Sequence, residues 1–300
     1  MNDSRMLCQV RTDCLITYNS TEYRMALSTV QKHKMMLAMK EAKKTQYGGN
    51  LTVGAKKRLT RAIDLLIQIS TKKYGYNQVT KKYHSHNLSF ITLTIPGDVL
   101  LTAEKGYDSL LKHFLQWLRR TKKINTYVWK AEFQKRGQLH YHITTPTWIH
   151  YQEIKDKWNS LLRSSGLLEN YFKEKKHYNP NSTDIHEVKS ISNLAGYLKK
   201  EFCKSIQNKQ TNGKLWDCSL NLKDNKYFKM ELDYKLLIKL HDDVKKGRYE
   251  KIELEQCNIY KPIEKNTTQQ VLTLKQIQDY KTYIEHIKNY IRIITPKEKK

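Results

Sequence analysis

The stretch Y-V-W-K-A-E-F-Q-K-R-G-Q-L-H-Y-H-I-T-T, residues 127–145, decides how the rest of the chain is interpreted. Polar and apolar residues alternate on both sides of Lys135-Arg136-Gly137, and this period of two predicts two β-strands joined by a three-residue loop. Glycine suits such a loop, which commonly ends in a left-handed residue. The stretch is therefore predicted to form a β-hairpin.

The predicted hairpin has one polar and one apolar face. Counting outward from the loop pairs Gln134 with Gln138. The same count pairs Glu132 with His140, and His142 follows two residues further along the same face. The opposite face carries five residues suited to a core: Ala131, Phe133, Leu139, Tyr141 and Ile143. A core explains the apolar face, and the polar face needs a different explanation.

The polar face has the composition of a metal site. One carboxylate and two imidazoles that converge across a strand pair form a site of the nitrogen and oxygen type. Three protein ligands leave coordination positions open, as a catalytic site requires. For an arbitrary His-x-His, a solvated hairpin face would be the better interpretation. Here the apolar alternation, the opposed acid and the turn glycine agree, so we predict that Glu132, His140 and His142 bind a metal ion.

The overall composition points to a polyanionic partner. Lys and Arg number 55 against 29 Asp and Glu, which gives a formal net charge of +26. A basic surface of this size indicates nucleic acid first, and a membrane surface is the weaker alternative. No apolar run reaches membrane-spanning length, and no signal peptide is evident. The five cysteines are odd in number and lack Cys-x-x-Cys spacing, which predicts free thiols in a reducing, cytoplasmic compartment.

The middle of the chain alternates between strand and helix patterns. A β-branched run at 89–95 ends at Pro96-Gly97 and predicts a strand, and apolar residues at helical spacing predict a helix over 103–120. After the hairpin we expect a helix over 151–162, a strand over 184–189 and a helix over 191–205. The order β-α-β-β-α-β is that of a ferredoxin-like split β-α-β unit. We therefore predict an α+β fold with helices packed on an antiparallel sheet.

The flanking segments are predicted less sharply. Residues 1–50 show little regular pattern and include a basic arm, and 72–86 is expected to be a loop. Thr52 is a plausible N-cap for a helix over 53–70. Extended chain is expected at 213–222 and 248–263, and helices at 232–244 and 274–293. We divide the chain into a basic arm with a helix (1–87), a catalytic domain (88–222) and a C-terminal helical extension (223–300).

The helix over 53–70 carries a cluster of basic residues. They are either a solvated helix face or a surface that contacts phosphates, and the sequence does not favour one interpretation over the other. The cluster consists of Lys56, Lys57, Arg58 and Arg61.

A candidate nucleophile lies on the helix predicted to follow the last strand. Tyr197 sits beside its apolar stripe, and Lys200 lies three residues on, so that both share one surface. A tyrosine beside a metal site can attack a phosphodiester and store the strand break as a phosphotyrosine. Lys200 would favour the phenolate or hold a non-bridging oxygen. In a chain with 20 tyrosines a structural role is the default, but this position raises Tyr197 above it.

These motifs resemble the HUH endonucleases, specifically the rolling-circle replication initiator (Rep) proteins of plasmids and of single-stranded DNA viruses and phages. Residues 90–94 resemble the first Rep motif, His140-Tyr141-His142 fits His-hydrophobic-His, and Tyr197 with Lys200 fits Tyr-x-x-Lys. The stretch 132–140 is similar to the phage and bacterial pattern E-x-Q-x-R-G-x-x-H, which adds Gln134 and Arg136 as supporting residues. The resemblance spans about residues 88–222.

The resemblance implies a specific reaction. It implies site-specific nicking of single-stranded origin DNA with Mg²⁺ or Mn²⁺, a 5′-phosphotyrosine at Tyr197 and a free 3′-OH that primes synthesis. With one tyrosine in the motif helix, a second subunit or water must end each round. The sequence has no Walker motif, so we expect a host helicase to unwind the duplex and a host polymerase to extend the primer.

Two alternatives stay open. A basic nucleic-acid-binding protein without chemistry would account for the charge and the tyrosines, but not for the three candidate ligands on one face. An HUH relaxase or a single-tyrosine transposase would use the same chemistry on another substrate. Relaxases usually carry a third histidine, and neither His150 nor His186 matches its place.

Overall fold

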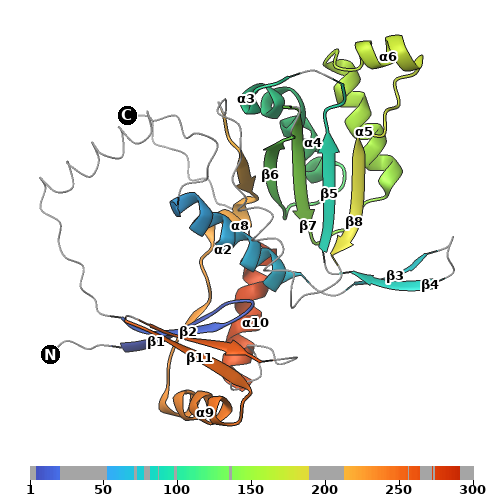
Figure 1. Ribbon diagram of the computed structural model, residues 1–300. Coiled ribbons are helices and arrows are strands. Elements are labelled where there is room, and N and C mark those ends of the chain that lie inside the picture. Colours follow the sequence, from blue (N-terminus) through green and yellow to red (C-terminus); the bar gives the residue numbers. More distant parts are fainter. Residues whose placement is uncertain are drawn as a thin grey trace, which may run out of the picture.

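The computed structural model describes residues 5–20, 53–70, 73–77, 82–86, 88–97, 100–134, 137–188, 213–255, 257–263, 272 and 274–290. Within these residues the chain forms two five-stranded sheets and a separate two-stranded hairpin, with helices packed around them (Figure 1). Neighbouring strands in all three sheets are antiparallel. The predicted α+β class with an antiparallel sheet is confirmed.

The sheet that carries the candidate ligands contains the predicted hairpin at its centre. Its order is β8 (Thr183–Val188), β5 (Leu88–Thr94), β7 (Leu139–Thr145), β6 (Val128–Phe133) and β9 (Trp216–Cys218). The two hairpin strands are β6 and β7, and β7 separates β6 from β5. A helical connection therefore joins two strands that are not neighbours, as the predicted order β-α-β-β-α-β requires.

Helices cover one face of this sheet. A continuous helix over 103–120 comprises α3 (Ala103–Gly106), the π-helical segment η1 (Tyr107–Leu111) and α4 (Lys112–Arg120). It packs beside α5 (Tyr151–Ser164), and α6 (Glu169–Lys175) follows. Trp158 of α5 is fully buried against this core, and its indole N–H donates to the Thr94 carbonyl at 2.8 Å. The predicted helices over 103–120 and 151–162 are confirmed.

Part of the opposite face is covered by α2 (Val53–Ile69), which runs across one end of the sheet together with α8 (Leu220–Asp224) and α10 (Leu274–Lys288) (Figure 1). Leu59 and Leu66 of α2 are fully buried in one cluster with Phe90 and Val128 of the sheet. The apolar stripe predicted for this helix is therefore its buried face. The remaining part of the sheet face carries the candidate ligands.

A second sheet joins the two ends of the chain and corrects the predicted organisation. Its order is β10 (Lys229–Glu231), β1 (Arg5–Val10), β2 (Leu15–Ser20), β12 (Cys257–Pro262) and β11 (Tyr249–Leu254). Residues 5–20 were expected to lack regular structure, but they form a hairpin in which Cys8, Val10 and Leu15 are buried. The C-terminal segment was expected to be helical, but it supplies three of these strands besides α9 (Tyr234–Lys245) and α10.

The loop expected at 72–86 is also corrected. It forms a hairpin of β3 (Lys73–Asn77) and β4 (Lys82–His86), which pair with each other. The composition is polar and lacks apolar alternation, which is why the pattern indicated a loop. The helix expected over 191–205 lies outside the described residues.

Two further predictions concern the cellular context. Within the described part of the chain, no helix is both long enough and apolar enough to cross a bilayer. Four cysteines are described and are free thiols: Cys8, Cys14, Cys218 and Cys257. Burial raises the pKa of the Cys8 thiol to about 12, so this group is protonated and unreactive at neutral pH.

Candidate active site

The hairpin turn fixes which residues oppose each other. The Gln134 N–H donates to the Gln138 carbonyl at 2.8 Å, and the Gly137 N–H donates to the Gln134 carbonyl at 2.8 Å. Gly137 has φ +88°, a conformation that glycine adopts without steric cost. The register that follows places Glu132 opposite His140, as predicted from the loop length.

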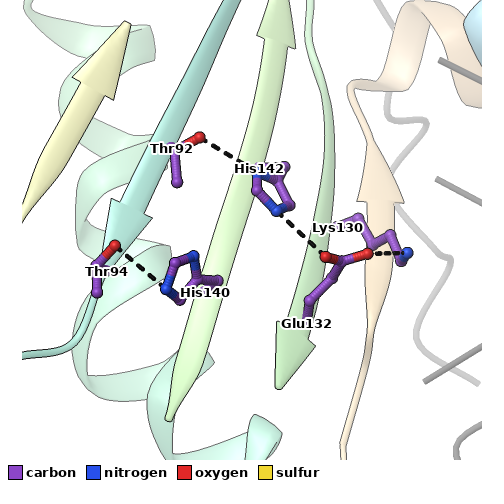
Figure 2. A network of polar contacts seen from close by, with 6 residues as sticks. All are labelled: Thr92, Thr94, Lys130, Glu132, His140 and His142. Carbon is purple, nitrogen blue, oxygen red and sulfur yellow. Dashed lines mark hydrogen bonds and ion pairs between the residues drawn. The ribbon is translucent and has the colours of Figure 1, made fainter. Parts of the chain in front are cut away.

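The polar face extends across three strands rather than two. Directly opposed residues share a face, so the pairing of β5, β7 and β6 creates two rows of polar side chains (Figure 2). The first row contains Thr94, His140 and Glu132, and the second contains Thr92, His142 and Lys130.

Glu132 is the centre of the contacts between these rows. One carboxylate oxygen, Oε2, lies 3.3 Å from His142 Nε2, and the other, Oε1, accepts a hydrogen bond from the Lys130 ammonium. The Lys130 side chain is only 1% exposed, whereas Glu132 is 25% exposed. A buried lysine therefore holds the carboxylate from below the surface of the sheet, and His142 contacts it from the neighbouring strand.

Threonines of β5 hold both imidazole rings. Thr92 Oγ1 lies 3.3 Å from His142 Nδ1, and Thr94 Oγ1 lies 3.4 Å from His140 Nε2 (Figure 2). Such outer contacts limit the rotation of a histidine and select which ring nitrogen carries the proton. The site is thus built from the three central strands of the sheet, each of which is paired on both sides.

The electrostatics of the site favour ligand forms of the side chains. Burial acts to raise the pKa of Glu132, but hydrogen bonds from His142 and Lys130 outweigh it and lower the pKa to about 2. Burial, with a smaller contribution from His142, lowers the pKa of His140 to about 4. At neutral pH, Glu132 is therefore a carboxylate and His140 a neutral imidazole, which are the protonation states that bind metal ions.

The three candidate ligands fit a divalent metal by donor type and by face. Their present arrangement brings Glu132 and His142 into contact, while the His140 ring is directed toward Thr94, with the two histidine ring centroids 6.1 Å apart. Within the described residues, no group of three His, Cys, Asp or Glu side chains is already close enough to hold a metal ion. The structure thus places the predicted ligands on one face and brings two of the three into contact.

The remaining predicted site residues are distributed as follows. Gln134 is exposed at the hairpin tip, beside the turn. Arg136, Tyr197 and Lys200 lie outside the described residues.

The basic cluster on α2 divides into two kinds of residue. Lys56, Lys57 and Arg58 are exposed, and they keep both interpretations of that helix open. Arg61 is partly buried, and its guanidinium donates to the Lys223 carbonyl at 3.4 Å. One of the four candidates therefore also links α2 to the neighbouring helix α8.

The sequence reasoning missed Lys130, Thr92 and Thr94. A signal was present, because Lys130 precedes Glu132 by two residues and so shares its face. The two threonines alternate with apolar residues in the strand over 89–95, and they point to the same face as the histidines. His186, interpreted as a surface strand residue, is exposed on β8 at 47%.

The comparisons with known proteins agree with this geometry. A family profile described as a replication-associated protein of the ORF2 type matches residues 88–206, the segment that contains β5, the hairpin and β8. Searches of curated proteins and of solved structures gave no match to this chain. Residues 88–206 therefore belong to this replication-associated protein family, and they make the chain a protein of the rolling-circle replication initiator type.

Proposed function

We propose that this chain is an HUH endonuclease that nicks single-stranded origin DNA and starts rolling-circle replication. The observation that carries the proposal is the placement of Glu132, His140 and His142 on one face of the central strands, inside the segment that matches a replication-associated family. The order β8-β5-β7-β6 supports the assignment of this sheet as the ferredoxin-like HUH core.

The proposed cofactor is Mg²⁺ or Mn²⁺, held by Glu132, His140 and His142. It would polarise the scissile phosphate and offset charge on its oxygens. The protein's own contribution is to present two imidazoles and one carboxylate in their ligand forms on a rigid face. Lys130 and the two threonines position those groups from the neighbouring strands.

The nucleophile of the proposed reaction is the Tyr197 phenol. Its oxygen forms a bond to the scissile phosphorus, the bond between phosphorus and the 3′ oxygen breaks, and the leaving oxygen takes up a proton to become the 3′-OH primer. The strand is then held as a 5′-phosphotyrosine, and attack by a 3′-OH rejoins it. We assign to Lys200 a role in favouring the phenolate or holding a non-bridging oxygen. A second subunit or a water molecule would end each round.

The decisive experiment is incubation of the full chain with a pool of single-stranded DNA and Mn²⁺, followed by mapping of the peptide-linked nucleotide. We expect a covalent adduct at Tyr197 that is abolished by Tyr197→Phe and retained by the matched control Tyr171→Phe. An adduct that forms equally on the Tyr197→Phe protein would show that the nucleophile is wrong.

The metal is tested separately. His142→Ala and chelation with EDTA should each abolish cleavage while DNA binding persists, because the ligands act on the chemistry. Full cleavage in EDTA would remove the metal from the mechanism. Binding without any cleavage, across the pool and both metals, would favour the non-catalytic nucleic-acid-binding protein. A preferred substrate that is a transfer origin or a transposon end would favour the relaxase or transposase.

A further inference from the structure

A pocket of about 720 Å³ lies at the β9 edge of the ligand-bearing sheet, on the side covered by α4. Trp129 and Asp217 are register partners on β6 and β9, and both line this pocket. Because side chains alternate across a strand, they point to the opposite face from Lys130. The pocket is therefore separate from the candidate active site, and it is reached around the edge of the sheet.

The walls of the pocket are basic. Four cationic side chains line it, together with one carboxylate, that of Asp217: Lys112, Arg119, Lys223 and Lys288. Lys223 lies 3.6 Å from Asp217, and Lys288 pairs with Glu285 at 2.6 Å. Within the described residues, neither Lys112 nor Arg119 has a carboxylate at ion-pair distance, and both are exposed. These two cations are available to a phosphate, which is the anion that Arg and Lys side chains commonly bind.

The floor of the pocket is aromatic. The Tyr107 and Trp129 rings are stacked, with centroids 5.5 Å apart and planes at 25°. Trp129 is buried and holds Tyr107, which is only partly buried and faces the open side. Such a stack offers one ring surface to a planar ligand without a large loss of side-chain freedom.

A hydrogen-bond network makes the far wall rigid. The Ser219 hydroxyl accepts from the Tyr127 N–H at 3.1 Å and donates to Asn221 Oδ1 at 2.6 Å. The Asn221 amide in turn donates to Thr126 Oγ1 at 2.8 Å and to the Ile287 carbonyl at 3.4 Å. The start of β6, α8 and α10 are thus tied together before any ligand arrives.

We propose that this pocket binds one nucleotide of single-stranded DNA, with the base on Tyr107 and the phosphate on Lys112 and Arg119. A volume of this size suits a small-molecule ligand, and a nucleotide combines the planar and anionic parts that the walls match. A duplex keeps its bases stacked inside the helix and presents no free base to the ring. The inference rests on the proposed function for its ligand class, and it adds a contact away from the scissile phosphate.

The test measures DNA binding in EDTA, so that cleavage does not contribute. A fluorescent oligodeoxythymidine of roughly 16 nucleotides is long enough to cover such a site. Arg119→Ala should reduce the slope of log affinity against log salt by about 0.7, the value for one lost phosphate contact on a single strand. Arg120→Ala, the adjacent exposed arginine outside the pocket, should leave the slope unchanged. Equal slopes for the two variants would overturn the phosphate assignment.

The base contact is tested by Tyr107→Leu, which should weaken binding roughly fivefold or more, the range for loss of one stacking partner. Tyr107→Phe retains a ring and should bind like the parent protein. Ultraviolet cross-linking of an iododeoxyuridine oligonucleotide to the unmodified chain should label the peptide that contains Tyr107. Cross-links confined to other peptides, or equal affinity for duplex DNA, would overturn the proposal. An adduct missing at Tyr197 would overturn only the proposed nicking.

Discussion

Lys130 is 1% exposed and forms an ion pair with Glu132, whose side chain is 25% exposed. Taking two charges out of water is costly, and the mutual attraction offsets this cost only when the geometry is good. The pair nevertheless has a clear consequence for the site, since it keeps the candidate ligand ionised and directs one of its oxygens toward His142. The residue scale thus shows a metal-ligand candidate held by an internal cation.

Removing that cation should be destabilising. Lys130→Met leaves the Glu132 carboxylate partly buried without its partner, and we expect a loss of about 1–3 kcal/mol, below the cost of a fully buried pair because Glu132 reaches solvent. Urea unfolding measures the change. Lys122→Met is the control, because its partner Glu153 is 47% exposed and the expected loss is below about 1 kcal/mol. Equal losses for the two variants would contradict a stabilising role for the buried pair.

The residues of the site differ in how far the sequence reveals them. Glu132 and His140 could be paired in advance, because a three-residue turn with a glycine determines the register of a hairpin. The burial of Lys130 could not be foreseen, because it depends on β9. That strand pairs Trp216 with Lys130 and closes the edge of the sheet, and nothing in the local pattern of β6 announces a partner 86 residues away.

At the scale of elements, the helix over 103–120 packs closely on β7. A Cβ atom at Gly106 would lie 2.7 Å from Leu139 Cδ1 and would also meet the Tyr141 hydroxyl. Both neighbours are fully buried, so neither can move away. The absence of a side chain at this one position sets the distance between the helix and the strand that carries both histidines.

Gly106→Ala tests that packing. In an exposed helix the change would stabilise by about 1 kcal/mol, but here overpacking costs about 1–3 kcal/mol, so we expect a net loss. Gly54→Ala in α2 is the matched control. Its added Cβ would lie 3.5 Å from an Arg58 nitrogen, an ordinary contact, and the change should be neutral or stabilising. Denaturant midpoints compare the two, and a rise for both would show that the helix is free to move.

The elements recovered from sequence are those with a strong apolar period. The strand β5 and the helices α4 and α5 each present a continuous buried stripe, which the pattern predicts directly. The hairpins β1–β2 and β3–β4 were missed for different reasons. In β1–β2 only a few residues, among them Cys8, Val10 and Leu15, are buried on strands of six residues. In β3–β4 the sequence is polar throughout, and the strands pair only with each other.

At the scale of the whole molecule, the two ends of the chain form one sheet. Leu7 pairs with Glu231, and Thr17 pairs with Asn258, across more than 200 residues. The predicted basic arm and the predicted helical extension therefore contribute neighbouring strands to one structure. Sequence periodicity reports on local segments only, so pairing at this separation was beyond its reach. The catalytic segment was recognised because its motifs and its core are close in sequence.

The buried core also crosses the predicted boundaries of the catalytic domain. Leu59 of α2, Phe90 and Val128 of the ligand-bearing sheet, and Ile287 of α10 belong to one buried cluster. Each is 3% exposed or less. If residues 88–222 are expressed alone, the sheet face that α2 and α10 cover becomes exposed. We expect this fragment to bind an apolar dye and to unfold at lower denaturant concentration than the full chain, because the lost burial of several large apolar side chains costs about 1.5–3 kcal/mol each.

The same comparison can locate the missing cover. A fragment over residues 53–222 restores α2 and should recover part of the lost stability, whereas the full chain adds α10 and recovers the rest. The buried residues Leu59, Ile63 and Leu66 make α2 the larger contributor, so the step from 88–222 to 53–222 should be the larger of the two. A fragment over 88–222 that binds no dye and unfolds at the midpoint of the full chain would show that the catalytic segment folds independently. In that case the shared core would be a docking contact between separate units, and α2 would be free to serve DNA.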